Sequence, residues 1–148
     1  MIIRAAKIED IQQIQVVRNS VEENRLTNSQ LVTDEDCIEF ITQRGKGWVC
    51  QVYNEIVGFS IVDLKENNVW ALFLKREYER RGIGRQLHDV MLHWYFQQTK
   101  KDIWLSTDRF TRAEMFYTKA GWCEVGKHGG ETKFEMTYNN WLLRNIDS

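Results

Sequence analysis

The stretch that decides the fold runs from Val69 to Arg85 and reads VWALFLKREYERRGIGR. Its first six residues, Val69 to Leu74, are all apolar, which is typical of a strand covered on both faces. Gly82 and Gly84 allow a tight turn, and the N–H groups in the first turn of a helix starting there point toward a bound anion. Together with the neighbouring arginines, this pattern indicates a phosphate-binding turn behind a buried strand.

The residues after this turn predict a helix and a further strand. Apolar residues recur at helical spacing from Gly82 to about Gln98, and the run from Ile103 to Ser106 reads as a strand. A strand, a helix and a strand in this order favour a right-handed parallel crossover. The glycine turn would then lie at the carboxyl end of a central strand, where ligands of open α/β sheets usually bind.

The residues before it predict one strand, two helices and a hairpin. Residues 2–6 read as a short strand, and apolar residues at helical spacing predict a helix from about Ile8 to Glu23. Thr33, followed by three acidic residues, is typical of the N-cap of a second helix. Residues 48–53 and 56–62 read as the strands of a hairpin.

The last third of the chain predicts a helix and a closing hairpin. Thr111 is a candidate N-cap for this helix, and Gly121 follows its expected end. Residues 122–125 and 132–138 read as the hairpin strands. We expect the tail from Asn139 to be peripheral.

The composition is that of a single soluble globular domain over residues 1–148, with 43% hydrophobic residues, 28% charged residues and a net charge of −1. This balance creates no global field toward nucleic acid or a membrane, so we expect neither as a partner. We see no signal peptide and no run long enough to span a membrane. Cys37, Cys50 and Cys123 are widely spaced, which argues against disulfides or zinc and favours a cytoplasmic protein.

Two common phosphate-binding motifs do not fit the glycine turn. The dinucleotide-binding fingerprint needs a third glycine where Leu87 stands, and the Walker A motif needs a Gly-Lys-Ser/Thr sequence that is missing. A nucleotide-phosphate binding protein sharing only the turn remains an alternative.

Two segments resemble motifs of the GCN5-related N-acetyltransferases (GNAT). The segment from Leu72 to Gly84 is similar to their acetyl-coenzyme A motif, Q/R-x-x-G-x-G/A, and the segment from Thr111 to Trp122 is similar to their second signature. The resemblance implies an α/β fold with a single GNAT domain over residues 1–148. Its mixed central sheet of six to seven strands would be flanked by about four helices. The order would be strand, two helices, three strands, helix, strand, helix and hairpin.

Three residues depart from the family pattern. Glu79 stands where the pattern has Gln or Arg, and Arg76 stands where many members have proline. Phe110 replaces an asparagine that contacts the pantetheine arm in many members. A carboxylate at Glu79 beside a pyrophosphate would be unfavourable unless it points away or pairs with an arginine.

The resemblance implies a site for acetyl-coenzyme A and no metal. The last two residues of the strand, Phe73 and Leu74, would pair with the pantetheine amides. The acetyl group would lie between the strands that contain Leu74 and Trp104. Consecutive backbone N–H groups would hold the pyrophosphate, namely those of Arg80, Arg81, Gly82, Ile83, Gly84 and Arg85.

The implied reaction is attack of an amine on the thioester carbonyl. A strand N–H of Phe73 or Leu74 would stabilise the oxyanion, and Tyr117, which matches the motif tyrosine, would assist the leaving thiolate. Unperturbed tyrosine titrates near ~10 and a thiol near ~8.5, so full proton transfer would be uphill by roughly 2 kcal/mol. We therefore expect Tyr117 to act mainly by donating a hydrogen bond. The alternative is a core tyrosine beside Phe116.

The general base is open, because the strand from Val69 to Leu74 contains no carboxylate. Asp63, Glu35 and His128 are candidates, although a strand-end acid, a helix cap and a turn histidine are the simpler interpretations. Cys123 is a weaker candidate for an acyl carrier, since direct transfer needs none.

The amine acceptor is not specified by any motif. In the family, two regions form the acceptor wall, and they correspond to residues from Arg18 to Asp34 and from Gly126 to Lys133. Acidic residues in the first region would attract a cationic amine, but exposed helix acids usually only solvate their surface. They are Glu22, Glu23, Asp34 and Glu35. Homodimers are common with this fold, and a non-catalytic acyl-coenzyme A binding or sensing module is the alternative function.

Overall fold

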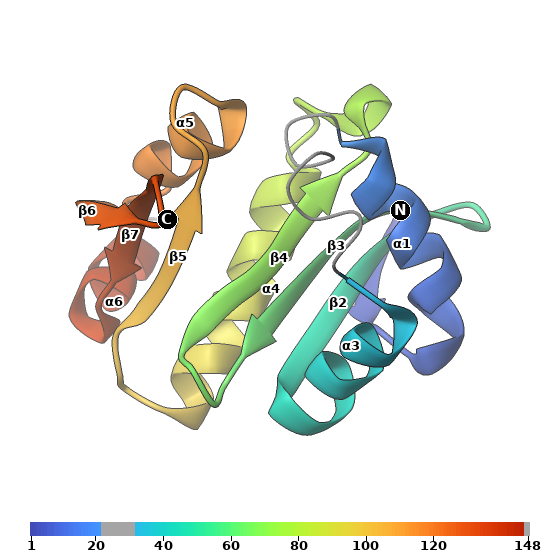
Figure 1. Ribbon diagram of the computed structural model, residues 1–148, viewed down its shortest axis with the longest axis horizontal. Helices are drawn as coiled ribbons and strands as arrows, with labels where there is room; N and C mark the ends of the chain where they lie inside the picture. Colours follow the sequence, from blue (N-terminus) through green and yellow to red (C-terminus); the bar gives the residue numbers. More distant parts are fainter. Residues whose placement is uncertain (22–31, 147–148) are drawn as a thin grey trace. The chain divides into compact units, whose positions relative to one another are not determined.

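The computed structural model describes residues 1–21 and 32–146, and it divides into two compact units, Met1–Tyr95 and Phe96–Ser148 (Figure 1). The predicted end of the first helix at Glu23 lies outside the described residues. Among the described helices, none has the length and apolar character needed to cross a membrane.

The first unit contains four antiparallel strands. They are β1 (Ile2–Ala5), β2 (Gly45–Val52), β3 (Glu55–Asp63) and β4 (Asn68–Leu74), in this spatial order. The predicted hairpin of β2 and β3 is confirmed. Its turn places Tyr53 in the left-handed region, at a φ of 56°. β2 begins three residues earlier than predicted, because Gly45 to Gly47 continue the ladder with β3.

Three α-helices belong wholly or mainly to this unit: α1 (Ile11–Ser20), α3 (Asp34–Glu39) and α4 (Ile83–Gln98). The first predicted helix begins as a 3₁₀ turn, η1 (Ile8–Asp10), which leaves Ile8 exposed. The predicted cap of α3 is confirmed, because the Thr33 hydroxyl accepts from the Asp36 N–H and the Asp36 carboxylate accepts from the Thr33 N–H. α3 continues into a π-helical turn, η2 (Phe40–Arg44).

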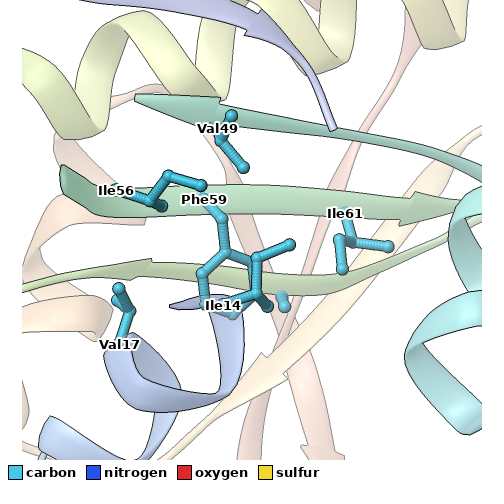
Figure 2. Packing of buried hydrophobic residues seen from close by; sticks show 7 residues of the cluster. Ile14, Val17, Val49, Ile56, Phe59 and Ile61 are labelled. Carbon is cyan, nitrogen blue, oxygen red and sulfur yellow. The ribbon is translucent and has the colours of Figure 1, made fainter. Parts of the chain in front are cut away.

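The two faces of β3 pack against different helices. Phe59 and Ile61 point toward α1 and form a core with Ile14 and Val17 (Figure 2). Alternate residues point to the other face, where the Ser60 hydroxyl donates to the backbone oxygen of Leu87 in α4. This alternation explains why nearly the whole of β3 is buried.

The second unit contains three strands in the order β5-β7-β6: β5 (Ile103–Thr107), β6 (Cys123–His128) and β7 (Glu131–Met136). α5 (Arg112–Lys119) begins after Thr111, whose hydroxyl accepts from the Glu114 N–H, as predicted. The expectation of a peripheral tail is wrong. Residues Tyr138–Ile146 form α6, and the buried Trp141 ring lies 6.2 Å from the Phe96 ring. Tyr138 and Trp141 lie three residues apart, a helical spacing that could have predicted α6.

The element order agrees with the family resemblance. The described residues supply seven strands, at the upper end of the predicted six to seven. They also form five α-helices, where about four were predicted, and α6 is the one not anticipated.

Candidate functional site

The arginine-glycine turn is an exposed cationic surface at the start of α4. A short 3₁₀ turn, η3 (Arg76–Tyr78), links it to β4. Arg80 and Gly82 both adopt positive φ, at 65° and 80°, and the Gln86 N–H donates to the Gly82 oxygen at 3.1 Å. Gly82 therefore caps α4 without a side chain, which leaves the N–H groups of the first helical turn facing outward. A Cβ atom at Gly82 would meet nothing within 4 Å.

The three arginines of this turn have different surroundings. Arg80 is exposed, and the Arg81 guanidinium lies 5.2 Å from the centre of the Tyr78 ring. Arg85 is paired with Asp89 at 3.1 Å, one helical turn further on. Arg80 and Arg81 thus carry the positive charge of the turn, and the Arg85 charge is balanced in part by Asp89.

The backbone direction at the end of β4 follows from one hydrogen bond. The Lys75 N–H donates to the Val57 oxygen at 2.8 Å, and the Phe73 oxygen also lies on the β3 side, next to Gly58. Because N–H groups along a strand alternate in direction, the Leu74 N–H points away from β3. Of the two predicted oxyanion donors, Leu74 has its N–H on the edge that β3 does not occupy.

Gly58 allows the side chain of Leu74 to lie close to β3. The two residues are directly opposite in the ladder, and a Cβ atom at Gly58 would stand 2.8 Å from Leu74 Cδ1 and 3.1 Å from the Leu87 Cδ1 atom of α4. A larger residue would push the end of β4 away from α4. Gly58 thus positions the predicted reactive strand, a role that the sequence pattern did not suggest.

Tyr117 lies in α5 and is buried. Its ring makes edge-to-face contacts with Phe116 and Trp122, at centroid distances of 5.3 Å and 5.6 Å, and a tilted contact with Phe134 at 6.3 Å. Burial raises the pKa of the Tyr117 hydroxyl far above its ordinary value. The hydroxyl is therefore neutral near pH 7 and is suited to donate a hydrogen bond rather than to release a proton.

Glu114 ties the start of α5 to β7. Its carboxylate accepts from the Thr132 hydroxyl at 2.7 Å and from the Phe110 N–H at 3.0 Å, and the hydrogen bond from Thr132 lowers the Glu114 pKa. These bonds fix the loop before α5. In that loop Phe110 is 90% exposed and has a φ of 62°, which is unusual for an aromatic residue.

The candidate general bases occupy different environments. The buried Asp63 carboxylate accepts from Arg44 at 2.7 Å and from the N–H groups of Lys65 and Glu66, so it closes a turn. Glu35 is exposed in the first turn of α3. The His128 ring lies at the end of β6, 4.8 Å from the Trp104 ring of β5. Asp63 has the structural role that its position suggested. Cys123 is exposed and forms no disulfide, and its sulfur accepts from the Asn140 side chain at 4.0 Å.

The predicted site residues fall into two groups. Phe73, Leu74 and the turn from Arg80 to Arg85 belong to the first unit, whereas Tyr117 belongs to the second. Arg18, in the first unit, was predicted only as the first residue of the expected acceptor wall. Arg18 is 5% exposed, and its place four residues after the buried Ile14 and seven after the buried Ile11, on the same helical stripe, gave a signal for burial.

Most of the chain matches one protein family. The model of the family described as "Acetyltransferase (GNAT) family" matches residues 8–122. No curated protein matches the chain by sequence.

Several solved structures share the fold at low sequence identity. The PaiA N-acetyltransferase from Thermoplasma acidophilum, in complex with coenzyme A, is 19% identical, with a TM-score of 0.75 over 93% of this chain and 100% of that chain. An acetyltransferase of the GNAT family from Staphylococcus aureus Mu50 is 20% identical, with a TM-score of 0.76 over 93% and 98%. A ribosomal-protein-alanine N-acetyltransferase from Brucella melitensis is 16% identical, with a TM-score of 0.73 over 93% and 99%.

Proposed function

This chain belongs to the GNAT family of acetyltransferases, and from that premise we propose that it transfers the acetyl group of acetyl-coenzyme A directly to an amine. The turn from Arg80 to Arg85 is the observation that carries the proposal. It combines a left-handed backbone at Arg80 and Gly82, a start of α4 at a glycine that has no side chain, and exposed guanidinium groups. Together these features suit a pyrophosphate.

The turn and the end of β4 would hold different parts of the cosubstrate. N–H groups from Arg80 to Arg85 bind the pyrophosphate, and the open space at Gly82 lets the phosphate oxygens approach the backbone. The outward edge of β4 at Leu74 pairs with the pantetheine amides as an added strand would, whereas the Phe73 backbone groups face β3. This arrangement presents the thioester beside the Leu74 N–H.

The chemistry requires an oxyanion donor and a group that stabilises the leaving thiolate. The amine nitrogen attacks the thioester carbonyl, the Leu74 N–H donates to the developing oxyanion, and the C–S bond then breaks as the carbonyl reforms. Tyr117 donates a hydrogen bond to the departing sulfur. Its raised pKa makes full transfer of the phenolic proton less favourable, so the proton lost by the amine is what finally neutralises the thiolate.

The protein's own residues offer no carboxylate in β4 to accept the amine proton. A route through water to Glu35 or His128 is consistent with their exposure. The same feature favours the alternative of a module that binds acyl-coenzyme A without catalysis.

The test separates binding from catalysis. Thermal unfolding of the purified protein is measured with acetyl-coenzyme A, ATP and NAD in separate samples. We expect acetyl-coenzyme A alone to raise the midpoint, and a shift with ATP alone would contradict the assignment. Release of free thiol is then followed with a panel of amines. Thiol release with at least one amine supports an enzyme, and a thermal shift without release for any amine supports the sensing module.

A further inference from the structure

Arg18 presents a buried guanidinium with an unpaired nitrogen. The residue lies on α1 and is 5% exposed. Its guanidinium carbon lies 5.2 Å from the centre of the Trp70 ring and 5.1 Å from the centre of the Phe73 ring, both on β4. Among the residues that the structure describes, Arg18 Nε is the one buried side-chain nitrogen or oxygen without a hydrogen-bond partner.

Arg44 is a second arginine whose guanidinium lies over an aromatic ring, and it can be compared with Arg18. The Arg44 guanidinium lies 5.1 Å from the Phe40 ring, and that ring stacks on Trp70 at 3.9 Å. Arg44 is nevertheless paired with the Asp63 carboxylate at 2.7 Å. Arg18 lies over Trp70, one ring of that stack, and over Phe73, without an ion pair to any described carboxylate.

This arrangement is unfavourable for the protein alone. Burial lowers the pKa of Arg18, and the charged or titratable group acting on it most directly is the thiol of Cys37. Burial raises the pKa of that thiol to about 11, so Cys37 is uncharged at neutral pH and supplies no counter-charge. An arginine remains protonated in this setting, and an uncompensated buried charge costs stability. The unpaired guanidinium of Arg18 is therefore suited to form an ion pair with an anionic ligand.

The contact with Phe73 places this cation at the proposed reaction centre. Phe73 directly precedes Leu74, whose N–H is the proposed oxyanion donor, and its ring is the surface on which Arg18 rests. The phosphates of the cosubstrate have their own site at the turn from Arg80 to Arg85, and an acetyl group carries no charge. The remaining reactant is the amine acceptor.

We propose that Arg18 binds a carboxylate of the acceptor, so that the substrate is an amine that also carries a carboxylate, as an amino acid does. The proposal rests on the acetyltransferase function above and specifies its substrate class. A guanidinium can form two parallel hydrogen bonds with a carboxylate, and this pairing would hold the amine at a set distance from the thioester. It would favour acids over their amides by about tenfold or more.

The test compares Arg18→Met, Arg18→Lys and the control Arg44→Lys, which keeps a cation beside Asp63. Without ligand, Arg18→Met removes an unpaired buried charge and keeps an apolar side chain of similar length, so its thermal midpoint should equal or exceed that of the wild type. A clear fall would show that contacts within the chain, including those with Trp70 and Phe73, offset the burial of the guanidinium, and would overturn the proposal.

Ligand binding is then measured with saturating coenzyme A and a panel of common L-amino acids, β-alanine and 4-aminobutyrate, each beside its amide. We expect at least one acid, and not its amide, to raise the midpoint of the wild type and of Arg44→Lys. Arg18→Met should lose this shift while keeping the shift caused by coenzyme A, and Arg18→Lys should keep part of it. Thiol release should show the same preference, mainly in KM.

Three outcomes would overturn the proposal: no acid of the panel shifts the wild type, amides match acids, or Arg18→Met retains the preference for acids. A donor with a carboxylate, succinyl-coenzyme A, is included as a further arm. Arg18-dependent preference for it over acetyl-coenzyme A would assign the carboxylate to the donor and contradict the acceptor assignment. Failure of the acetyltransferase function is distinguishable, because no amine would then release thiol from acetyl-coenzyme A, whether or not coenzyme A itself shifts the midpoint.

Discussion

The backbone N–H of Lys75 donates a 2.8 Å hydrogen bond to the oxygen of Val57, and this bond turns the N–H of Leu74 away from β3. At the end of β4, the Leu74 N–H is therefore a hydrogen-bond donor that faces away from β3 within the first unit. That donor is the group to which we assign the oxyanion.

Replacing Leu74 with proline tests this assignment. Leu74→Pro removes the outward N–H without removing a ladder bond to β3, so we expect the thermal midpoint to fall less than in Phe73→Pro. Loss of an oxyanion donor should lower kcat by about 10²- to 10³-fold. Leu74→Ala is the matched control, because it shortens the side chain and keeps the N–H. Equal kcat values for the proline and alanine variants would remove the Leu74 N–H from the mechanism.

Removing the Tyr117 hydroxyl should affect turnover more than binding. We expect Tyr117→Phe to lower kcat by about 10²-fold, in the range for a positioned proton donor, with little change in the dissociation constant of coenzyme A. Tyr138→Phe, in α6 of the same unit, serves as the control. Unchanged turnover at saturating substrate would assign Tyr117 to the core alone.

The raised pKa of Tyr117 also predicts a pH dependence. Burial disfavours the phenolate, so the hydroxyl keeps its proton well above the ordinary tyrosine pKa of about 10. Loss of this proton therefore should not reduce kcat between pH 7 and about 10. The pH profiles of kcat for wild type and Tyr117→Phe should then have the same shape in that range, and a basic limb confined to the wild type would contradict this.

Replacing Gly82 with alanine tests two effects, backbone strain at a positive φ and the approach of coenzyme A to the backbone. A residue with a Cβ atom at its φ of 80° costs about 1 kcal/mol, although the Cβ itself would meet no atom of the protein within 4 Å. Gly82→Ala should therefore lose that much stability and, in addition, bind coenzyme A at least several-fold more weakly. Gly130→Ala is matched, with a φ of 92° and equally open space, and should lose stability alone. Calorimetric titration with coenzyme A distinguishes the two.

Phe110 carries strain that a smaller polar residue relieves. Asparagine accepts a φ near 62° far better than phenylalanine, so Phe110→Asn should raise the free energy of unfolding by about 0.5–1 kcal/mol. Phe110→Ala removes the exposed ring but retains most of the strain. Urea unfolding of both variants measures the difference, and equal stabilities would show that strain at this position is negligible.

Asp10 gives the first unit an acid-sensitive contact. Its carboxylate accepts from Arg4 at 2.8 Å and 2.9 Å and from the Lys7 N–H, and the hydrogen bond with Arg4 lowers its pKa. Because the folded pKa lies below the unfolded value of about 3.9, this stabilisation is complete above pH 5 and is lost as the pH falls below 4. Asp10→Asn should cost about 1–3 kcal/mol at pH 7. The gap between the wild type and Asp10→Asn in urea unfolding should narrow at pH 3, and a constant gap would contradict the linkage.

The sequence predicted the elements whose signals are local. The apolar run of β4, the period change at Gly82 and the caps at Thr33 and Thr111 depend on residues within one or two turns, and all appear where expected. The cationic turn also followed from its glycines and arginines. By contrast, the packing of α6 depends on Trp141 meeting Phe96, which is 45 residues away in sequence, and no local pattern identifies that partner.

By itself, the sequence determined the succession of strands and helices as far as β7, the family motifs and the position of the arginine-glycine turn, because these depend on backbone preferences and short-range spacing. Only the tertiary structure decided which way the Leu74 N–H points and which arginine lacks a counter-charge. Both properties depend on partners distant in the chain: Val57 turns Leu74 outward, and Asp63 neutralises Arg44 across 19 residues while Arg18 Nε stays unpaired. Charge compensation is a property of the packed fold, and no local pattern contains it.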